Sequence, residues 1–350
     1  MDRCGKTTPE VVLCAKISFR LAGAGSPRGF RRNDQRMKKE KRMLGNGLLI
    51  LTAMIWGTAF VFQRVGMEDI EPITFNAARM ALAAAAVGAV SAVPTQSERN
   101  KLAAMSVRDR EAYRTNTVIG GICCGLALCT AGNIQQIGLY YTSVSHSGFI
   151  TALYVVIVPL LGLFLRKRIT PVMWCCVIAS AIGLYLLCIP AGGFGAINIG
   201  DVIVFICAIC FAVHILIIDY FSPKVDGVKL SCIQFFVAGI VSIIISLFAD
   251  PALGFDLPSV GDVCASWLSI LYTGIMSCSV AYTLQILGQK ETEPAIASMI
   301  LCLESVFALI AGMILLGEVM TLREILGCVI MFAAIFVANL PEDSLRISRS

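Results

Sequence analysis

The sequence predicts an all-α integral membrane protein with about ten transmembrane helices in two inverted five-helix repeats. Of its 350 residues, 57% are hydrophobic and 15% are charged, with a mean hydropathy of +0.81, whereas a soluble domain carries roughly 25% charged residues. Residues 115–165 contain no Asp, Glu, Lys or Arg. A run of this length crosses a ~30 Å hydrocarbon layer twice, at roughly 20 residues per helix. No soluble fold requires such a run, so we expect the chain to lie in a lipid bilayer.

Residues 1–44 form a separate polar and basic region. They hold twelve of the 28 Lys and Arg residues, so the net charge of +5 mainly describes this region and does not indicate a nucleic-acid partner. The apolar stretch 11–24 is interrupted by two basic residues, unlike a signal peptide. We expect a disordered cytoplasmic tail. As an alternative, translation begins at Met37 or Met43.

Ten apolar segments follow and are the predicted transmembrane helices. They are residues 45–65, 72–93, 117–138, 144–165, 171–189, 200–219, 229–249, 264–288, 294–316 and 322–340. Three of them begin with a proline, which suits the first helical turn, where a missing N–H costs nothing: Pro72, Pro171 and Pro294. Thr170 is placed to cap the fifth helix, and Thr321-x-x-Glu324 has the spacing of a capping box at the start of the tenth.

The positive charges predict the orientation of these helices. If the N-terminus is inside, the cytoplasmic connections and tails hold 25 of the 28 Lys and Arg residues, and the outer connections hold only Arg323. Arg64 and Arg79 fall within or at the edge of helices. Lys and Arg accumulate on the cytoplasmic side of membrane proteins. We therefore expect both termini to be cytoplasmic.

Two stretches about 150 residues apart resemble one another. Gln135-x-x-Gly138 in the third segment matches Gln285-x-x-Gly288 in the eighth, and the connections 141–143 and 291–293 follow in register. This similarity predicts a first repeat at residues 45–189 and a second at 200–340, before a cytoplasmic tail at 341–350. Five helices is an odd number, so the second repeat must be upside down relative to the first. Inverted repeats are typical of secondary transporters, which bind substrate near the membrane midplane between the repeats, although channels and a few membrane enzymes also arise by duplication.

Several stretches resemble the EamA-type domain of the drug/metabolite transporter superfamily. They are Ile55–Phe60 in the first segment, Ser147–Val156 with Pro159 in the fourth, and Leu303–Phe307 through Leu316-Gly317-Glu318 in the ninth. The resemblance covers about residues 45–340. It implies export or import of amino acids, metabolites, nucleotide sugars or drugs across the plasma or inner membrane, without ATP. It also implies a central cavity lined by helices one, three, four, six, eight and nine.

Two positions depart from the family pattern. Arg166-Lys167 stands where the second copy has Gly317-Glu318, so that carboxylate is present in one copy only. Ser305 replaces the proline that usually follows the Glu304 position. This second change is expected to straighten a helix that the family normally kinks.

Polar and aromatic residues inside the predicted helices are the candidate substrate-binding residues. They are Trp56, Arg79, Asn133, Gln135, Gln136, Tyr154, His214, Tyr282, Gln285 and Glu304. Ionisable groups in lipid are costly unless they face protein or water. Glu304, the only acidic residue well inside a span, would bind a proton or a substrate amine, or would be a packing carboxylate. Arg79 would neutralise a substrate carboxylate or Glu304, or have a structural role.

The other candidates also have two interpretations. His214 would relay protons or line the bundle as a satisfied imidazole. The four amides would line the cavity or hold helices together. The three aromatic residues would form the walls of a ligand site or anchor helices at the membrane interface. Gly121-x-x-x-Gly125 would let helix backbones approach closely.

Catalytic and metal sites are not expected. The fifteen cysteines lie mostly in apolar runs, where they act as small hydrophobes. Cys207-x-x-Cys210 lacks the second pair or histidines of a zinc site. Nucleotide-loop, H-E-x-x-H and G-x-S-x-G motifs are absent. We expect no cofactor and no metal; the partners are a small-molecule substrate and the lipid bilayer, with no nucleic acid, and a homodimer remains an option.

These observations predict a secondary transporter rather than an enzyme. It would move a small metabolite, amino acid or drug-like solute by alternating access, as an exporter. A passive channel would instead show flux without saturation. A membrane-embedded enzyme of small-molecule metabolism would need a cluster of polar residues at an interface, and a scaffold would have no substrate.

Overall fold

The structure is a computed structural model. It describes residues 27–93, 96–167, 169–189, 192–193, 195, 197–252, 254, 259–316 and 320–340. The chain divides into one compact unit at Met1–Met43 and a second at Leu44–Ser350; apart from the first residues of α2, the following paragraphs concern the second. The expectations for residues 1–26 and for the tail at 341–350 lie outside the described residues.

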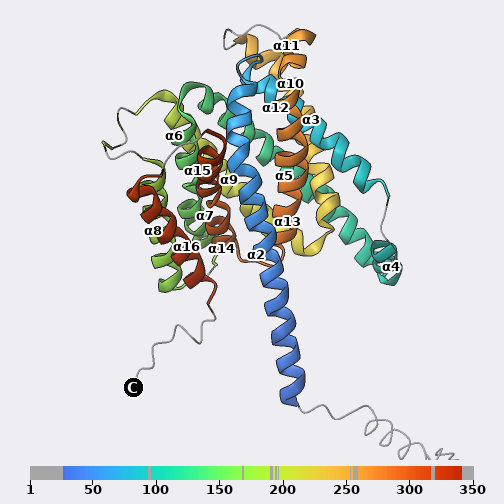
Figure 1. Cartoon of the computed structure of the whole chain (residues 1–350). Coiled ribbons are helices and arrows are strands. Elements are labelled where there is room, and N and C mark those ends of the chain that lie inside the picture. The colour runs from blue at the N-terminus through green and yellow to red at the C-terminus, as the bar shows by residue number, and fades with distance from the viewer. Residues whose placement is uncertain are drawn as a thin grey trace, which may run out of the picture. The chain divides into compact units, whose positions relative to one another are not determined.

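All regular elements of the described residues are helices (Figure 1). In chain order they are α2 (Pro27–Gly66), α3 (Pro72–Ser91), α4 (Gln96–Ala104), α5 (Val107–Tyr141), α6 (Val144–Ala152), α7 (Tyr154–Phe164), α8 (Pro171–Cys188), α9 (Ile199–Phe221), η1 (Ser222–Lys224), α10 (Gly227–Ala252), α11 (Val260–Ala265), α12 (Trp267–Leu271), η2 (Tyr272–Tyr282), α13 (Thr283–Gln289), α14 (Pro294–Leu301), α15 (Glu304–Leu316) and α16 (Leu322–Ala338). Nine spans in this part of the chain are long and apolar enough to cross a membrane. The tenth predicted segment is α16, with 17 residues. The predicted all-α fold is confirmed.

Several helices begin at the residues that the sequence predicted, with the predicted prolines and capping side chains. Proline occupies the first turn of α3, α8 and α14. The Thr170 hydroxyl accepts a hydrogen bond from the Met173 N–H, 3.2 Å away, and so caps α8. Thr321 and Glu324 form a reciprocal capping box at the start of α16. These predictions are confirmed because the caps depend only on neighbouring residues.

Two helices begin earlier than predicted. α2 begins at Pro27, so residues 27–44, expected to be disordered, are helical. Between residues 31 and 43 the chain has no Gly or Pro and is rich in Arg, Lys and Met, which favour helix. α5 begins at Val107, ten residues before the predicted start, behind the N-cap Ser106. The apolar pattern predicted only the membrane-crossing part of each helix.

Three predicted helices are interrupted. The fourth segment breaks at Leu153, between α6 and α7, and Pro159 lies within the continuous helix α7. The ninth breaks at residues 302–303, where the Cys302 thiol donates to the Met299 carbonyl, 3.0 Å away, and disturbs the helical ladder. The expectation that Ser305 straightens this helix is therefore wrong. The eighth segment is divided into α11, α12, the π-helix η2 and α13.

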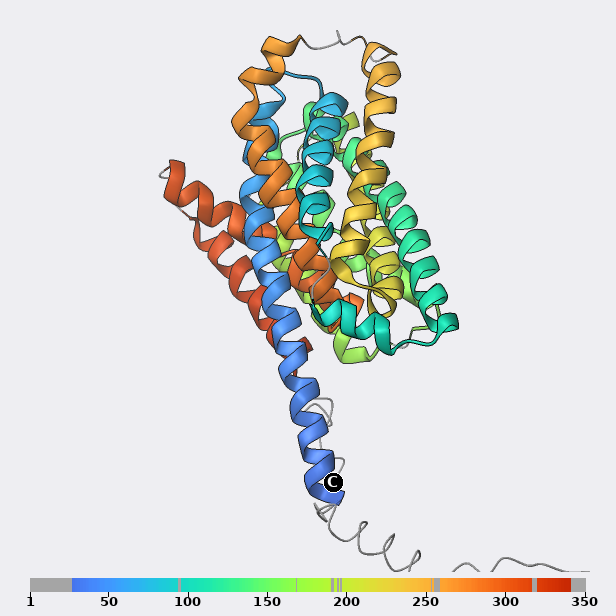
Figure 2. The same cartoon turned by 90° about the vertical axis from the view of Figure 1, so that its right-hand side faces the viewer.

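The two halves of the bundle pack through equivalent helices. α5 packs against α9 and α10, and in the other half η2 packs against α3. The helices α3 and α10, which occupy the same place in each half, pack against each other, as do α8 and α16. Figure 2 shows α3 and α10 running side by side through the bundle.

Pairs of glycines make these close contacts possible. A Cβ at Gly200 of α9 would lie 2.8 Å from the Gly138 carbonyl oxygen of α5, and a Cβ at Gly288 of α13 would lie 2.8 Å from the Gly45 carbonyl oxygen of α2. Gly138 and Gly288 are the matched glycines of the internal similarity, so each repeat uses the same residue for the same helix crossing. Within α5, a Cβ at Gly125 would lie 2.7 Å from the Gln234 carbonyl oxygen of α10. This contact explains the Gly121-x-x-x-Gly125 pattern.

The end of α7 holds an unusual residue in a left-handed conformation. Arg166 has φ 58°, and the flanking hydrogen bonds from Arg166 N–H to Leu163 and from Lys167 N–H to Gly162 form a Schellman motif. This motif favours glycine, because a Cβ in this conformation costs about 1–2 kcal/mol. The second repeat has Gly317 at the equivalent position.

Arg166→Gly is therefore expected to stabilise the protein by roughly 1 kcal/mol. Arg166→Ala keeps the Cβ and should give no such gain. Thermal unfolding of the two variants, followed by intrinsic fluorescence in detergent, separates the backbone effect from loss of the exposed arginine side chain. Equal melting temperatures for the Gly and Ala variants would show that the left-handed conformation of residue 166 does not destabilise the protein.

Candidate functional site

A small cavity lies inside the second unit, between the two repeats. Its volume is about 40 Å³, and it is lined by Trp56, Ala59, Phe60, Gln63, Arg79, Gln135, Tyr154, Phe211, Ser277, Tyr282 and Glu304. These residues come from helices of both repeats: α2, α3, α5, α7, α9, η2 and α15. A cavity of this size holds only a few water molecules.

The two helix breaks meet at this cavity. Tyr154 is the first residue of α7 and Glu304 is the first residue of α15. The Tyr154 hydroxyl donates to Glu304 Oε1 over 3.2 Å. The two side chains are 3% and 4% exposed, so the hydrogen bond joins equivalent breaks of the two repeats away from bulk water.

Arg79 brings a positive charge to the same cavity. Its side chain is 4% exposed, and its Nε donates to Asn76 Oδ1 over 2.9 Å. The structure describes both Arg79 and Glu304, and no ion pair joins them. Each charge therefore lines the cavity separately, which is costly in a membrane interior unless each faces polar groups or a ligand.

Aromatic rings and the π-helix η2 form another wall. The rings of Trp56 and Tyr282 have centroids 4.6 Å apart, and Trp56 Nε1 donates to the Ser277 carbonyl oxygen over 3.1 Å. One turn earlier on α2, the Thr52 hydroxyl donates to the Ala281 carbonyl oxygen over 3.1 Å. These bonds hold α2 against η2, a type of helix that is frequent at functional sites.

A glycine positions Glu304 against α2. A Cβ at Gly57 would lie 2.6 Å from the Glu304 carbonyl oxygen and 2.7 Å from the Ala308 backbone nitrogen. Because both neighbours are backbone atoms, only glycine permits this approach. Gly57 thus fixes where α15 begins relative to the cavity.

Six of the ten predicted site residues line the cavity: Trp56, Arg79, Gln135, Tyr154, Tyr282 and Glu304. The other four lie outside its lining: Asn133, Gln136, His214 and Gln285. Asn133 joins Asn76 and Ser242 in a hydrogen-bonded network among α3, α5 and α10. His214 is fully buried, with Nε2 2.9 Å from Gln234 Oε1.

Gln136 supports the cavity indirectly, because it donates a hydrogen bond to the lining residue Gln63. Gln285 is buried, 1% exposed, and does not reach the lining. The sequence analysis missed Gln63, Ser277 and Phe211. Gln63 carried a usable signal, since it is an amide inside an otherwise apolar segment, whereas Ser277 and Phe211 are of types common in any membrane helix.

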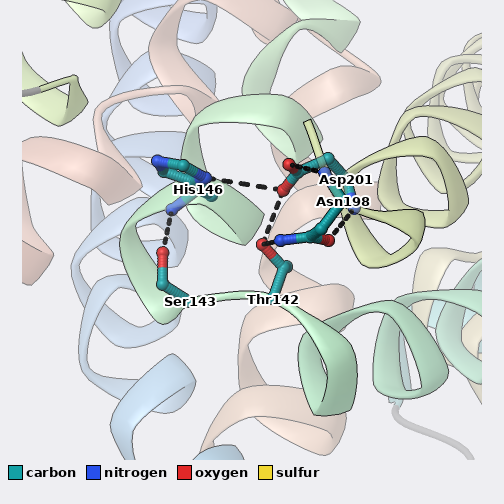
Figure 3. Close-up of polar contacts among 5 residues, drawn as sticks. All are labelled: Thr142, Ser143, His146, Asn198 and Asp201. Atoms are coloured by element: carbon teal, nitrogen blue, oxygen red, sulfur yellow. Dashed lines mark hydrogen bonds and ion pairs between the residues drawn. The ribbon is translucent and has the colours of Figure 1, made fainter. Parts of the chain in front are cut away.

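A second polar cluster joins the end of α5 to the starts of α6 and α9 (Figure 3). Thr142 donates to Asp201 Oδ1 over 2.5 Å, and His146 Nδ1 lies 3.5 Å from the same oxygen. In the other repeat, the matched Thr292 donates to Asn46 Oδ1 over 3.0 Å. Equivalent threonines therefore join equivalent pairs of helices in the two repeats.

This fold and this cavity define a class: multi-pass membrane proteins that transport solutes, built from two repeats around a buried polar site. The chain belongs to the EamA-like transporter family, whose sequence model matches it twice, at residues 43–189 and 198–340. The resemblance noted from the sequence and the membrane fold are thereby confirmed.

Two comparisons show how far the similarity extends. A protein of Archaeoglobus fulgidus described as "Uncharacterized transporter" is 26% identical over 301 residues, which are 86% of this chain and 87% of that protein. A solved chain described as "Crystal structure of protein" is 17% identical and superposes with a TM-score of 0.66, covering 86% of this chain and 98% of that chain. The second comparison shows a shared fold.

Proposed function

We propose that the protein is a secondary transporter that exports a small zwitterionic solute by alternating access. The observation that carries this proposal is that Arg79 and Glu304 line one buried cavity without pairing with each other. A solute with a carboxylate and an amine, such as an amino acid, would satisfy both charges. Trp56 and Tyr282 would then contact its apolar body.

The repeat geometry supports alternating access. Discontinuous helices surround the substrate site in many transporters built from inverted repeats. Here the breaks at Leu153 and at residues 302–303 occupy the same place in each repeat and meet at the cavity. Short i→i−3 hydrogen bonds at the breaks, such as Leu303 N–H to Ile300 oxygen at 3.1 Å, are typical of hinges.

The orientation belongs to the same proposal. We place residues 45–189 and 200–340 as oppositely oriented repeats in the plasma or inner membrane, with both termini cytoplasmic. The distribution of Lys and Arg supports this orientation. On this orientation the cluster around Asp201 lies at the outer end of the bundle and α14 begins at the inner end.

Solute counterflow in proteoliposomes tests the function. Proteoliposomes that contain the purified protein are loaded in turn with members of a panel of amino acids, amines, carboxylates and neutral metabolites. Uptake of a trace amount of the same labelled solute is then measured. We expect saturable counterflow for zwitterionic members and none in empty liposomes. Flux that does not saturate would indicate a channel, and no counterflow with any member would contradict the proposal.

A further inference from the structure

A second, larger cavity lies in the bundle near the end of α7. Its volume is about 290 Å³, and it is lined by Val158, Pro159, Gly162, Lys167, Ile169, Asp219, Glu293, Pro294 and Ala295. We call it the Lys167 recess. The Lys167 and Asp219 side chains are 37% and 22% exposed, so water reaches the recess.

The recess lies along the same helix faces as the central cavity. On α7, Tyr154 lines the central cavity and Val158 lines the recess, four residues or about 6 Å further on. On α9, Phe211 and Asp219 have the same relation, eight residues or about 12 Å apart. The two cavities are therefore neighbours along one seam of the bundle.

Among the residues that the structure describes, three charged side chains line the recess. Lys167 forms an ion pair with Asp219. Glu293, the exposed residue before α14, has no side-chain cap hydrogen bond and no ion pair with any described residue. The described lining therefore carries two carboxylates and one ammonium group, beside an apolar surface formed by Val158, Pro294 and their neighbours.

The backbone at the end of α7 directs Lys167 into this position. Arg166 adopts its left-handed conformation, and the Lys167 N–H returns to the Gly162 carbonyl oxygen, 3.0 Å away. Gly162 and Lys167 both line the recess. A lysine stands here although the second repeat has Glu318 at the equivalent position, so the ammonium group is a feature of this repeat alone.

We propose that the Lys167 recess is a second solute site, which binds the ammonium group of an amine-bearing solute between Asp219 and Glu293, and that the Lys167 ammonium takes this place when the recess is empty. The inference rests on the proposed transport function in one respect: the recess would be the first site that an exported solute meets when it leaves the cytoplasm. The ammonium group of the solute would replace the Lys167 ammonium group beside Asp219. The Asp219 carboxylate would therefore have a positively charged partner in both states. The apolar wall would receive the rest of the solute.

Equilibrium binding of phenethylamine tests the site, with 2-phenylethanol as a neutral probe of similar size. Full-length protein carrying Glu304→Gln is used in phosphatidylcholine nanodiscs, so that the carboxylate of the central cavity does not contribute. We expect phenethylamine to bind and phenylethanol not to bind. Adding Glu293→Gln should weaken phenethylamine binding about tenfold, the usual effect of losing a hydrogen bond to a charged group.

Lys167→Met gives the decisive result, because it should tighten phenethylamine binding several-fold by removing the competing ammonium group. A purely structural role of Lys167 predicts weaker or unchanged binding. Glu291→Gln, an exposed carboxylate of the same connection that does not line the recess, is the matched control and should change nothing. Unchanged affinity in Lys167→Met, or equal binding of phenylethanol, would overturn the proposal.

Phosphatidylethanolamine carries the same ammonium chemistry, so the lipid is varied separately. Unchanged phenethylamine affinity in nanodiscs that contain this lipid supports a soluble occupant. Strong competition by the lipid would overturn the assignment to a solute. A failure of the transport proposal looks different: counterflow would be absent in the wild-type protein while the opposite effects of Lys167→Met and Glu293→Gln persist.

Discussion

Glu304→Gln should lower uptake of the transported solute in proteoliposomes by at least about 30-fold while leaving the protein folded in the membrane. The substitution keeps the shape of the side chain and removes its negative charge. An amine bound at this buried position would lose its charge partner, an effect worth about 2–5 kcal/mol, or at least roughly 30-fold in transport. Tyr154→Phe removes only the hydroxyl that donates to Glu304 Oε1, so it should reduce transport much less.

The measurement is the initial rate of uptake at several solute concentrations, with an imposed pH gradient and without one. Glu291→Gln serves as the control for removal of a carboxylate elsewhere in the same half. Melting temperatures of all variants show whether each protein is folded. Wild-type uptake by the Glu304→Gln protein would remove Glu304 from the mechanism.

Gly57→Ala should impair both stability and transport. The new Cβ would lie 2.6 Å from the Glu304 carbonyl oxygen, and because that neighbour is backbone, α15 must move away from α2. Overpacking of this kind costs about 1–3 kcal/mol. The shift would also displace the Glu304 carboxylate from the cavity, so transport should fall at least about tenfold, the effect of a misplaced binding group.

Gly47→Ala is the matched control, because it lies on the same helix with no atom within 4 Å of the added Cβ. Alanine favours helix over glycine by up to about 1 kcal/mol, so this variant should melt at the same or a higher temperature and transport normally. Similar losses in both variants would show that the close contact at Gly57 is not responsible.

The sequence predicted those features of the fold that depend on neighbouring residues. Pro171 and Thr170 start α8, and Thr321 with Glu324 starts α16, as expected from capping chemistry. The helix breaks were not predicted, because the break at Leu153 lies among apolar residues and that at Cys302 contains neither proline nor glycine. The π-helix η2 was not predicted either. The Thr52 and Trp56 side chains of α2 donate hydrogen bonds to its carbonyl oxygens, and such contacts between distant segments cannot be read from the local sequence.

The residues of the candidate site could likewise be predicted only in part. Arg79 and Glu304 were identifiable because a charge in an apolar segment needs a partner or a ligand. The sequence did not distinguish lining amides from packing amides: Gln135 reaches the cavity, whereas Asn133, two residues earlier on α5, bonds to Asn76 and Ser242. Which side of a helix faces the cavity depends on its neighbours, so this distinction required the structure.

The central claim is that two oppositely oriented five-helix repeats enclose the cavity. Pro171 and Leu322 test it most directly, since they are the exposed first residues of the equivalent helices α8 and α16. Each is replaced by cysteine in a background without other reactive cysteines, and intact cells are treated with a membrane-impermeant maleimide. The account predicts that Leu322→Cys is labelled in intact cells and Pro171→Cys only after permeabilisation, whereas labelling of both from the same side would contradict it.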